Sequence, residues 1–213
     1  MAGIRAYQAG DRPAVREIAC DTAARGEPVE RFFHDRELFA DVLTRYYTDW
    51  EPPAVWIAEQ DRRVVGYLTG CLETGRYQQV MARRIIPTAT ARAIGRGALL
   101  HPSAWRLLAA LVQTWRIGGL RRLLLDAYPS HLHVNLRPEA RGRRIGAALV
   151  ERFLSQVQAA GSCGVHAAVR SDNGAAQRFF ERLGFAELGR HPVVFPSGAV
   201  LERRDTIVYG RRV

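Results

Sequence analysis

The sequence predicts an α/β (α+β) chain, in which strands and helices alternate. At residues 132–136, Leu132, Val134 and Leu136 occupy every second position, the spacing of a β-strand. A helical pattern with apolar residues three and four apart follows from position 145. The same order returns later, where a short apolar strand at 164–170 precedes a second amphipathic helix. These two strand–helix units predict the fold class.

The N-terminal part supplies two more helices and a hairpin. Asp11 and Pro13 favour the start of a first helix, and Pro52 ends a second one. The turn at 60–63 separates two β-rich runs and so predicts an antiparallel pair. The predicted elements of this part are a strand at 4–7, a helix after Asp11, a helix at 31–50, and strands at 54–59 and 64–72.

Residues 76–124 differ from the strands around them. They are rich in arginine and alanine, are interrupted by Pro87 and Pro102, and have a helical pattern around Trp105–Trp115. We therefore expect a single domain over residues 1–213 with a helical insertion at about 76–124. Short strands at 193–195 and 206–209 are predicted to finish the chain.

Composition limits the function classes. With 213 residues, 47% hydrophobic and 24% charged, the chain is typical of globular proteins. Its net charge is +10, and all 31 basic residues are arginine, so no lysine amine is present for a Schiff base or self-acetylation. The charge fits an anionic ligand or nucleic acid. Nucleic acid is the less favoured partner, because the arginines are spread out and no zinc-finger or RNA-binding motif occurs.

The cysteines and the apolar runs indicate a cytoplasmic protein without a membrane partner. Cys20, Cys71 and Cys163 are odd in number and form no C-x-x-C pair. No run is long enough for a signal peptide at the N-terminus or for a bilayer span. His131 and His133 lack a third ligand at a telling spacing, so no metal is predicted.

The turn after the central strand has the features of a phosphate site. It reads Arg141-Gly142-Arg143-Arg144-Ile145-Gly146 and opens a helix. Free N–H groups of a first helical turn point at an anion, and the helix dipole favours negative charge there. Glycines at 142 and 146 permit a close approach to the backbone. A solvated basic turn is the alternative interpretation.

A second motif follows: Asn173-x-x-Ala176-x-x-Phe179-Phe180-x-x-Leu183-Gly184-Phe185. Together the two motifs resemble the GCN5-related N-acetyltransferase (GNAT) family over residues 130–188. In that family the signature [QR]-x-x-G-x-[GA] binds the pyrophosphate of acetyl-CoA. A finer resemblance, carried by His131-Leu132-His133 and Gly164-Val165-His166, is to bacterial relatives of the C-terminal acetyltransferase-like domain of O-GlcNAcase.

The resemblance implies a mixed, mostly antiparallel sheet of about seven strands flanked by helices. The strands near 131–137 and 164–170 would splay apart and admit the pantetheine arm. The implied reaction is acetyl transfer from acetyl-CoA to a primary amine, with an N–H near Leu136 holding the oxyanion. The expected cofactor-binding residues are Leu136, Arg137, Arg141, Gly142, Arg143, Arg144, Ile145, Gly146, Asn173 and Phe180.

His133 and Asn135, which share the polar face of the central strand with His131, are the catalytic candidates. An imidazole with a pKa near ~6.5 suits the removal of a proton from the attacking amine. Structural hydrogen bonding is the alternative for these side chains. Asp49 and Glu51 are secondary candidates for holding the amine.

Two residues depart from the family pattern. Arg144 stands where the signature has its first glycine, and Phe180 stands where the family has the tyrosine that protonates the leaving thiolate. Either the thiolate leaves unassisted, since thiol pKa values lie near ~8.5, or another group protonates it, or catalysis is absent or slow.

Two other function classes stay open. The phenylalanine at 180 is compatible with a non-catalytic acyl-CoA-binding module, and the net charge with a nucleic-acid-binding protein. The sequence does not identify the acceptor amine, and a homodimer remains an open assembly state.

Overall fold

The computed structural model describes residues 3–23, 26–118, 126–198 and 200–213. Within these ranges one seven-stranded sheet has the order β1-β2-β3-β4-β5-β7-β6. Every neighbouring pair is antiparallel except β4 and β5, which confirms the expected mixed, mostly antiparallel sheet. The strands are β1 (Gly3–Ala6), β2 (Val55–Gln60), β3 (Arg63–Cys71), β4 (Ser130–Leu136), β5 (Gly164–Arg170), β6 (Ala186–Ser197) and β7 (Val200–Arg212).

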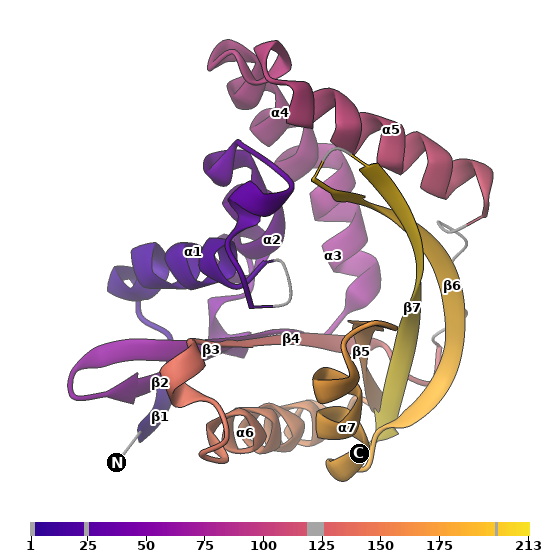
Figure 1. Cartoon of the computed structure of the whole chain (residues 1–213). Coiled ribbons are helices and arrows are strands. Elements are labelled where there is room, and N and C mark those ends of the chain that lie inside the picture. Colours follow the sequence, from indigo (N-terminus) through magenta and orange to yellow (C-terminus); the bar gives the residue numbers. More distant parts are fainter. Residues whose placement is uncertain (1–2, 24–25, 119–125, 199) are drawn as a thin grey trace.

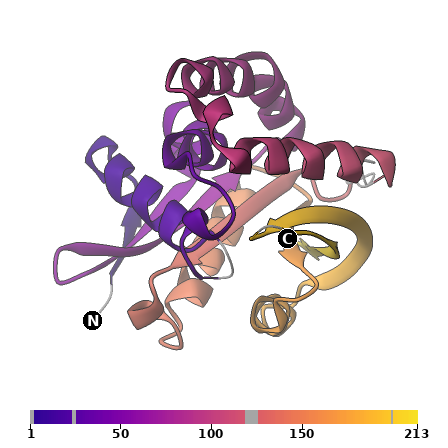
Figure 2. The same cartoon turned by 45° about the horizontal axis from the view of Figure 1, so that its top comes forward.

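Helices cover both faces of the sheet (Figure 1). They are α1 (Arg12–Asp21), α2 (Arg36–Asp49), α3 (Thr74–Val80), α4 (Ile86–Gly95), α5 (Pro102–Arg116), α6 (Ile145–Ala159) and α7 (Gly174–Arg182). In the chain, α3, α4 and α5 lie between β3 and β4, and a π-helical segment, Met81–Ile85, joins α3 to α4. Figures 1 and 2 show α4 and α5 together at one end of the molecule. No helix of the described ranges is long and apolar enough to cross a membrane.

Local capping differs between the first two helices. Asp35 caps α2 as an acceptor from the backbone N–H of Leu38 at 2.9 Å. Asp11, which the sequence predicts as a cap for α1, makes no side-chain cap bond and instead accepts from Arg5 at 2.7 and 2.8 Å. A nearby guanidinium is the stronger partner for a carboxylate, because both groups are charged.

The sheet separates two hydrophobic clusters. On one face, α6 buries Leu149 and Phe153 against Leu132 of β4. On the other face, α1 and α2 bury residues such as Ile18 and Tyr47 against β2 and β3. Because side chains alternate along a strand, the apolar residues of β4 face α6, and His131, His133 and Asn135 face the α1–α2 layer.

Strands β4 and β5 diverge soon after they begin. Only Ser130↔Val165 and His131↔His166 are in register. Beyond these pairs β4 stays paired to β3 as far as Leu136, and β5 stays paired to β7 as far as Arg170. The expected splaying of the two central strands is thus confirmed.

The last two strands are longer than the sequence predicts. Short strands were expected at 193–195 and 206–209, whereas β6 and β7 form one curved hairpin of 12 and 13 residues (Figure 1). The added residues are largely polar and escape an apolar pattern. Backbone pairing with β5 and between the two strands holds them in the sheet.

Candidate active site

The loop before α6 presents unpaired backbone donors. Helix α6 begins at Ile145, and Arg144 at its N-cap makes no side-chain cap bond. The first intrahelical bond from this end is donated by the N–H of Ala148 to Arg144 O at 3.0 Å. The N–H groups of residues 145–147 therefore precede the hydrogen-bond ladder and are free to receive an anion.

Two left-handed residues shape this loop. Gly142 has φ 75° and Arg144 has φ 60°. An L-residue in this region carries a cost of roughly 1–2 kcal/mol, which explains why glycine suits position 144 of the signature. Arg143 and Arg144 are both exposed, so their positive charges lie at the surface of the loop.

Gly146 lies where α6 approaches β4 and α7. A Cβ atom at this position would stand 3.2 Å from Cε2 of Phe179 and 3.4 Å from Cδ1 of Leu136. A side chain at this position would therefore have to displace Phe179 and Leu136 by a few tenths of an ångström, independently of any ligand. Ile145 beside it is 6% exposed and belongs to the α6 core.

Two of the predicted cofactor-binding arginines contact the protein itself. Arg141 donates to the backbone O of Leu136 at 3.2 and 3.3 Å. Arg137 forms ion pairs with Glu17 and Asp21 of α1 at 3.2 and 3.5 Å. The side chain of Arg137 thus lies on the α1 side of the sheet and is not brought to the start of α6.

The free edge of β4 carries unpaired donors as well. The backbone N–H of Arg137 donates to Val65 O at 2.9 Å, near the beginning of β3. Because N–H groups alternate between the two edges of a strand, that of Leu136 points the other way, toward β5. Registered pairing with β5 has already ended at His131. An N–H at this place is suited to holding a developing oxyanion.

His131 is held by two hydroxyl groups. Thr74 donates to Pro129 O at 2.6 Å, because a carbonyl only accepts, and its oxygen then accepts from Nδ1 of His131 at 2.8 Å. Nε2 is left as an acceptor for the Tyr47 hydroxyl at 2.9 Å. Burial, followed by repulsion from His133 and His166, lowers the pKa of His131 well below its usual value, so the ring is neutral.

His133 has no hydrogen-bond partner within the described ranges and is only half-buried. Its ring centroid is 5.9 Å from that of His131 and 6.1 Å from that of Tyr47. Burial, and secondly the charge of His166, lowers the pKa of His133 to about 4. It is an uncommitted, neutral imidazole. His166 donates from Nδ1 to Tyr128 O at 2.8 Å, and burial lowers its pKa too.

The remaining predicted site residues have packing or capping contacts. Asn135 donates from Nδ2 to Thr22 Oγ1 at 2.7 Å, which links β4 to the end of α1. Asn173 caps α7 as an acceptor from the N–H of Ala176 at 3.2 Å. Phe180 is 5% exposed, and its ring centroid lies 5.2 Å from that of Phe185.

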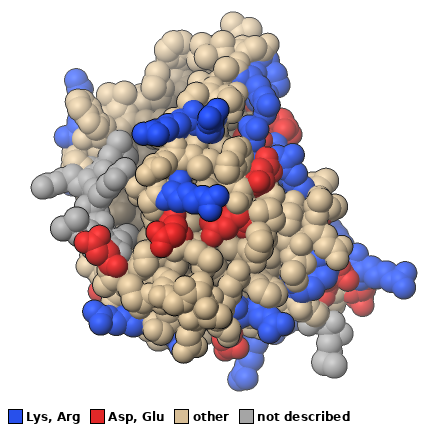
Figure 3. Space-filling model, turned by 180° about the vertical axis from the view of Figure 1, so that it is seen from behind, with Lys and Arg blue, Asp and Glu red and all other residues tan. Residues whose placement is uncertain are grey.

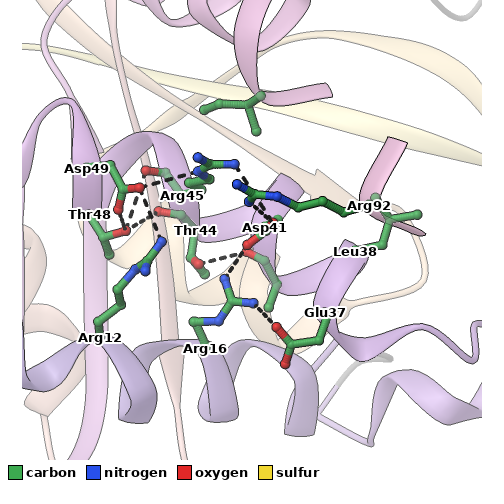
Figure 4. A network of polar contacts seen from close by, with 12 residues as sticks. Arg12, Arg16, Glu37, Leu38, Asp41, Thr44, Arg45, Thr48, Asp49 and Arg92 are labelled. Atoms are coloured by element: carbon green, nitrogen blue, oxygen red, sulfur yellow. Dashed lines mark hydrogen bonds and ion pairs between the residues drawn. The ribbon is translucent and has the colours of Figure 1, made fainter. Parts of the chain in front are cut away.

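The acidic residues after α2 are not free to hold an amine. Asp49 contacts Arg12 at 3.2 Å and Arg45 at 3.3 Å, in the polar network between α1 and α2 that Figure 4 shows. Glu51 accepts from the Tyr46 hydroxyl at 2.9 Å and from the N–H of Leu72 at 2.8 Å. Both carboxylates are engaged in holding the fold.

Two residues that hydrogen-bond to His131 were not predicted from the sequence. Tyr47 reads as one aromatic residue among several on α2, and Thr74 belongs to no motif. Both are far from His131 along the chain, so only the tertiary structure brings them together.

Comparisons with known proteins give a family match and several structural likenesses. A family model described as "Acetyltransferase (GNAT) family" matches residues 13–185. The crystal structure of SsHAT is 26% identical, with a TM-score of 0.73, and the match covers 99% of this chain and 98% of that one.

Two further likenesses show the fold alone. The structure of yncA, a putative acetyltransferase from Salmonella typhimurium with its cofactor acetyl-CoA, is 15% identical, with a TM-score of 0.59 and coverage of 100% and 94%. The ribosomal-protein-alanine N-acetyltransferase from Brucella melitensis is 18% identical, with a TM-score of 0.59 and coverage of 99% of each chain.

Proposed function

Since this chain belongs to the GNAT acetyltransferase family, which implies acetyl-CoA-dependent acetyl transfer, we propose that it acetylates a primary amine with His133 as the proton acceptor. The observation that carries the proposal is the neutral imidazole of His133, half-buried and without a hydrogen-bond partner in the described part of the chain. It lies on β4. The edge of β4 that faces β5 carries the free N–H of Leu136, at the opening where the two strands have separated.

The residues around this opening fit acetyl-CoA. The N–H groups of residues 145–147 would receive the pyrophosphate, and Arg143 and Arg144 add positive charge beside them. Gly142 leaves the approach to the loop clear, because no atom lies within 4 Å of the place where its Cβ would be. Acetyl-CoA supplies an acyl thioester, and the N–H of Leu136 would stabilise negative charge on its carbonyl oxygen.

The proposed base works in its neutral form. An amine attacks a carbonyl only when it is unprotonated, so a proton has to leave the amine on or before attack. A histidine with a pKa of about 4 is deprotonated at neutral pH and passes an accepted proton on to water. Tyr47 and His131 contact this ring and fix its surroundings.

The leaving thiolate finds no tyrosine at position 180. Phe180 packs against Phe185 and Tyr209, and the Tyr209 hydroxyl donates to Glu181 at 3.1 Å. We infer that the thiolate leaves without a protein acid, which its pKa near ~8.5 permits.

The test combines acetyl-CoA binding with CoA release. Calorimetric titration measures the affinity, and release of CoA is followed with a panel of small amines, sugars with amino groups and peptides. For His133→Gln we expect kcat to fall by roughly 10²–10⁴-fold with unchanged acetyl-CoA affinity. The matched control is His34→Gln. The His34 ring stacks on that of His101, with 4.3 Å between the ring centroids, and is not part of the candidate active site. Equal kcat for parent and His133→Gln would contradict the assignment.

The buried phenylalanine also supports a second candidate, a non-catalytic acyl-CoA-binding module. Such a module would bind acetyl-CoA in the calorimeter and release no CoA with any acceptor. Arg143→Glu should weaken binding in both cases, because it puts a negative charge at the predicted pyrophosphate site. Only the release of CoA in the presence of an amine distinguishes an acetyltransferase from a binding module.

A further inference from the structure

Helix α5 exposes most of its large apolar side chains and fully buries only small or polar ones. Its buried residues are small or polar, namely Ser103, Ala110 and Thr114. Thr114 accepts a hydrogen bond from the N–H of Val194 on β6 at 2.9 Å. Most large apolar side chains of the same helix are exposed, whereas Leu107 packs against the buried cluster that contains Val29 and Phe33. Trp115 is 67% exposed and Trp105 is 56% exposed.

We call the exposed apolar residues of α5, together with one residue that precedes it, the α5 apolar face: Leu100, Trp105, Leu108, Leu111, Val112 and Trp115. The spacing of 105, 108, 112 and 115 keeps them on one side of the helix. Leu100 precedes the helix and is 90% exposed. The indole N–H of Trp105 donates to Leu99 O at 2.9 Å, so the ring is fixed beside that turn. Exposed apolar patches of this kind mark interaction surfaces.

The chain segment that contains this face carries charge of one sign. Residues 74–118 contain no aspartate or glutamate, and their charged residues are all arginines. Arg83, Arg84 and Arg116 are exposed and form no ion pair within the described ranges. Arg116 follows Val112 by four residues and so flanks the apolar face. The uppermost part of Figure 3, where α4 lies, shows tan and blue atoms without red ones.

We propose that the α5 apolar face docks on an anionic phospholipid surface. Arginines beside a stripe of tryptophan and leucine are the combination that lies in a membrane interface, with anionic headgroups as counter-charges. Tryptophan at both ends of α5 suits this depth, because the indole is amphipathic. A second copy of the chain would bring arginine against arginine, with no acidic residue of this segment to pair them.

The proposal revises the expectation of no membrane partner. That expectation rests on the lack of a spanning stretch, and α5, with 15 residues, is indeed too short to span. A helix that lies flat on a surface needs no such length. The docking is independent of acetyl transfer, since it involves none of the residues placed in the candidate active site.

Co-sedimentation of the full chain with vesicles tests the proposal. We expect binding to vesicles of phosphatidylglycerol and phosphatidylcholine, weaker binding at high salt, and none to phosphatidylcholine alone. Trp115→Ser should weaken binding roughly tenfold, and Arg116→Glu at least about fivefold. The matched controls are Val200→Ser, which removes an exposed apolar side chain from β7, and Arg63→Glu, which reverses an exposed charge on β3.

Three results would overturn the proposal. One is no sedimentation with phosphatidylglycerol vesicles at low ionic strength by the folded parent. Another is equal weakening by the control substitutions. The third is a dimer in light scattering whose mass falls to the 23.8 kDa monomer in Leu108→Glu, which would give the α5 apolar face to a second copy. Circular dichroism of each variant shows that it is folded.

Discussion

Tyr47 of α2 donates its hydroxyl hydrogen to Nε2 of His131 on β4 across 2.9 Å. Both side chains are buried, and burial raises the pKa of Tyr47 well above its usual value, so the hydroxyl keeps its proton. Thr74 fixes the opposite nitrogen of the same ring. The tautomer of His131 is thereby set by two residues from two different helices, and the ring beside it, His133, remains uncommitted.

Removal of the Tyr47 hydroxyl should therefore destabilise the protein. Tyr47→Phe leaves Nε2 of His131 buried without a donor, at a cost of about 1–3 kcal/mol in the free energy of unfolding. A double-mutant cycle with His131→Ala, measured by urea denaturation, should give a coupling energy of roughly 1 kcal/mol or more. A coupling energy near zero would contradict the hydrogen bond.

Stability should fall as the pH drops from 7.5 to 5. The pKa values of His131, His133 and His166 are lowered in the folded protein, because burial disfavours their charged form. In the unfolded chain histidine titrates near ~6.5, so below that pH the unfolded state binds more protons than the folded state. For His133 the loss continues until the pH approaches its folded pKa of about 4.

Urea denaturation at several pH values measures this effect. His133→Gln removes one of the three groups, and its free energy of unfolding should depend less steeply on pH than that of the parent. The same slope in both proteins between pH 7.5 and 5 would show that His133 does not titrate as described.

Arg144→Gly should stabilise the protein by up to about 1 kcal/mol. The gain arises because φ 60° strains an arginine and not a glycine, although glycine loses more entropy on folding. Arg143→Gly is the matched control, since it removes the same charge from a residue without a positive φ, and should destabilise by about 0.5–1 kcal/mol. Urea denaturation measures the change in the free energy of unfolding for both variants. Changes of the same sign would contradict backbone strain at Arg144.

Gly146→Ala should destabilise the protein by about 1 kcal/mol or more, because the added Cβ presses on Phe179 and Leu136. Gly75→Ala in α3 is the control, since nothing lies within 4 Å of its Cβ position and alanine favours a helix. The melting temperature should fall in the first variant and rise in the second. Phe179→Leu combined with Gly146→Ala should recover part of the loss. A larger substitution at 146 therefore tests packing before it tests cofactor binding.

Local pattern was sufficient for the elements that carry the family resemblance. The alternation of Leu132, Val134 and Leu136 predicted β4, and the glycine-containing basic turn predicted the start of α6. Asn173, which opens the second motif, caps α7. These features depend on residues a few positions apart, which is the range over which backbone conformation is determined.

The partners of the polar side chains could not be read from the chain. Arg137 was expected near the cofactor, and its guanidinium instead contacts carboxylates of α1. Asn135 was a catalytic candidate, and its amide contacts Thr22. In each case the partner is more than a hundred residues away in the sequence, so spacing gave no signal.

The sequence by itself determined the order of strands and helices, the glycine-containing basic turn before α6 and the family of this protein, because these features are encoded in short-range periodicity and in two compact motifs. Only the tertiary structure shows which nitrogen of His131 carries a proton, that His133 has no hydrogen-bond partner among the described residues, and which side of α5 is exposed. The physical reason is that helical periodicity in the sequence identifies an apolar face of a helix but does not indicate which segment of the protein packs on that face. The packing of segments that are distant in the sequence determines which side of a helix is covered.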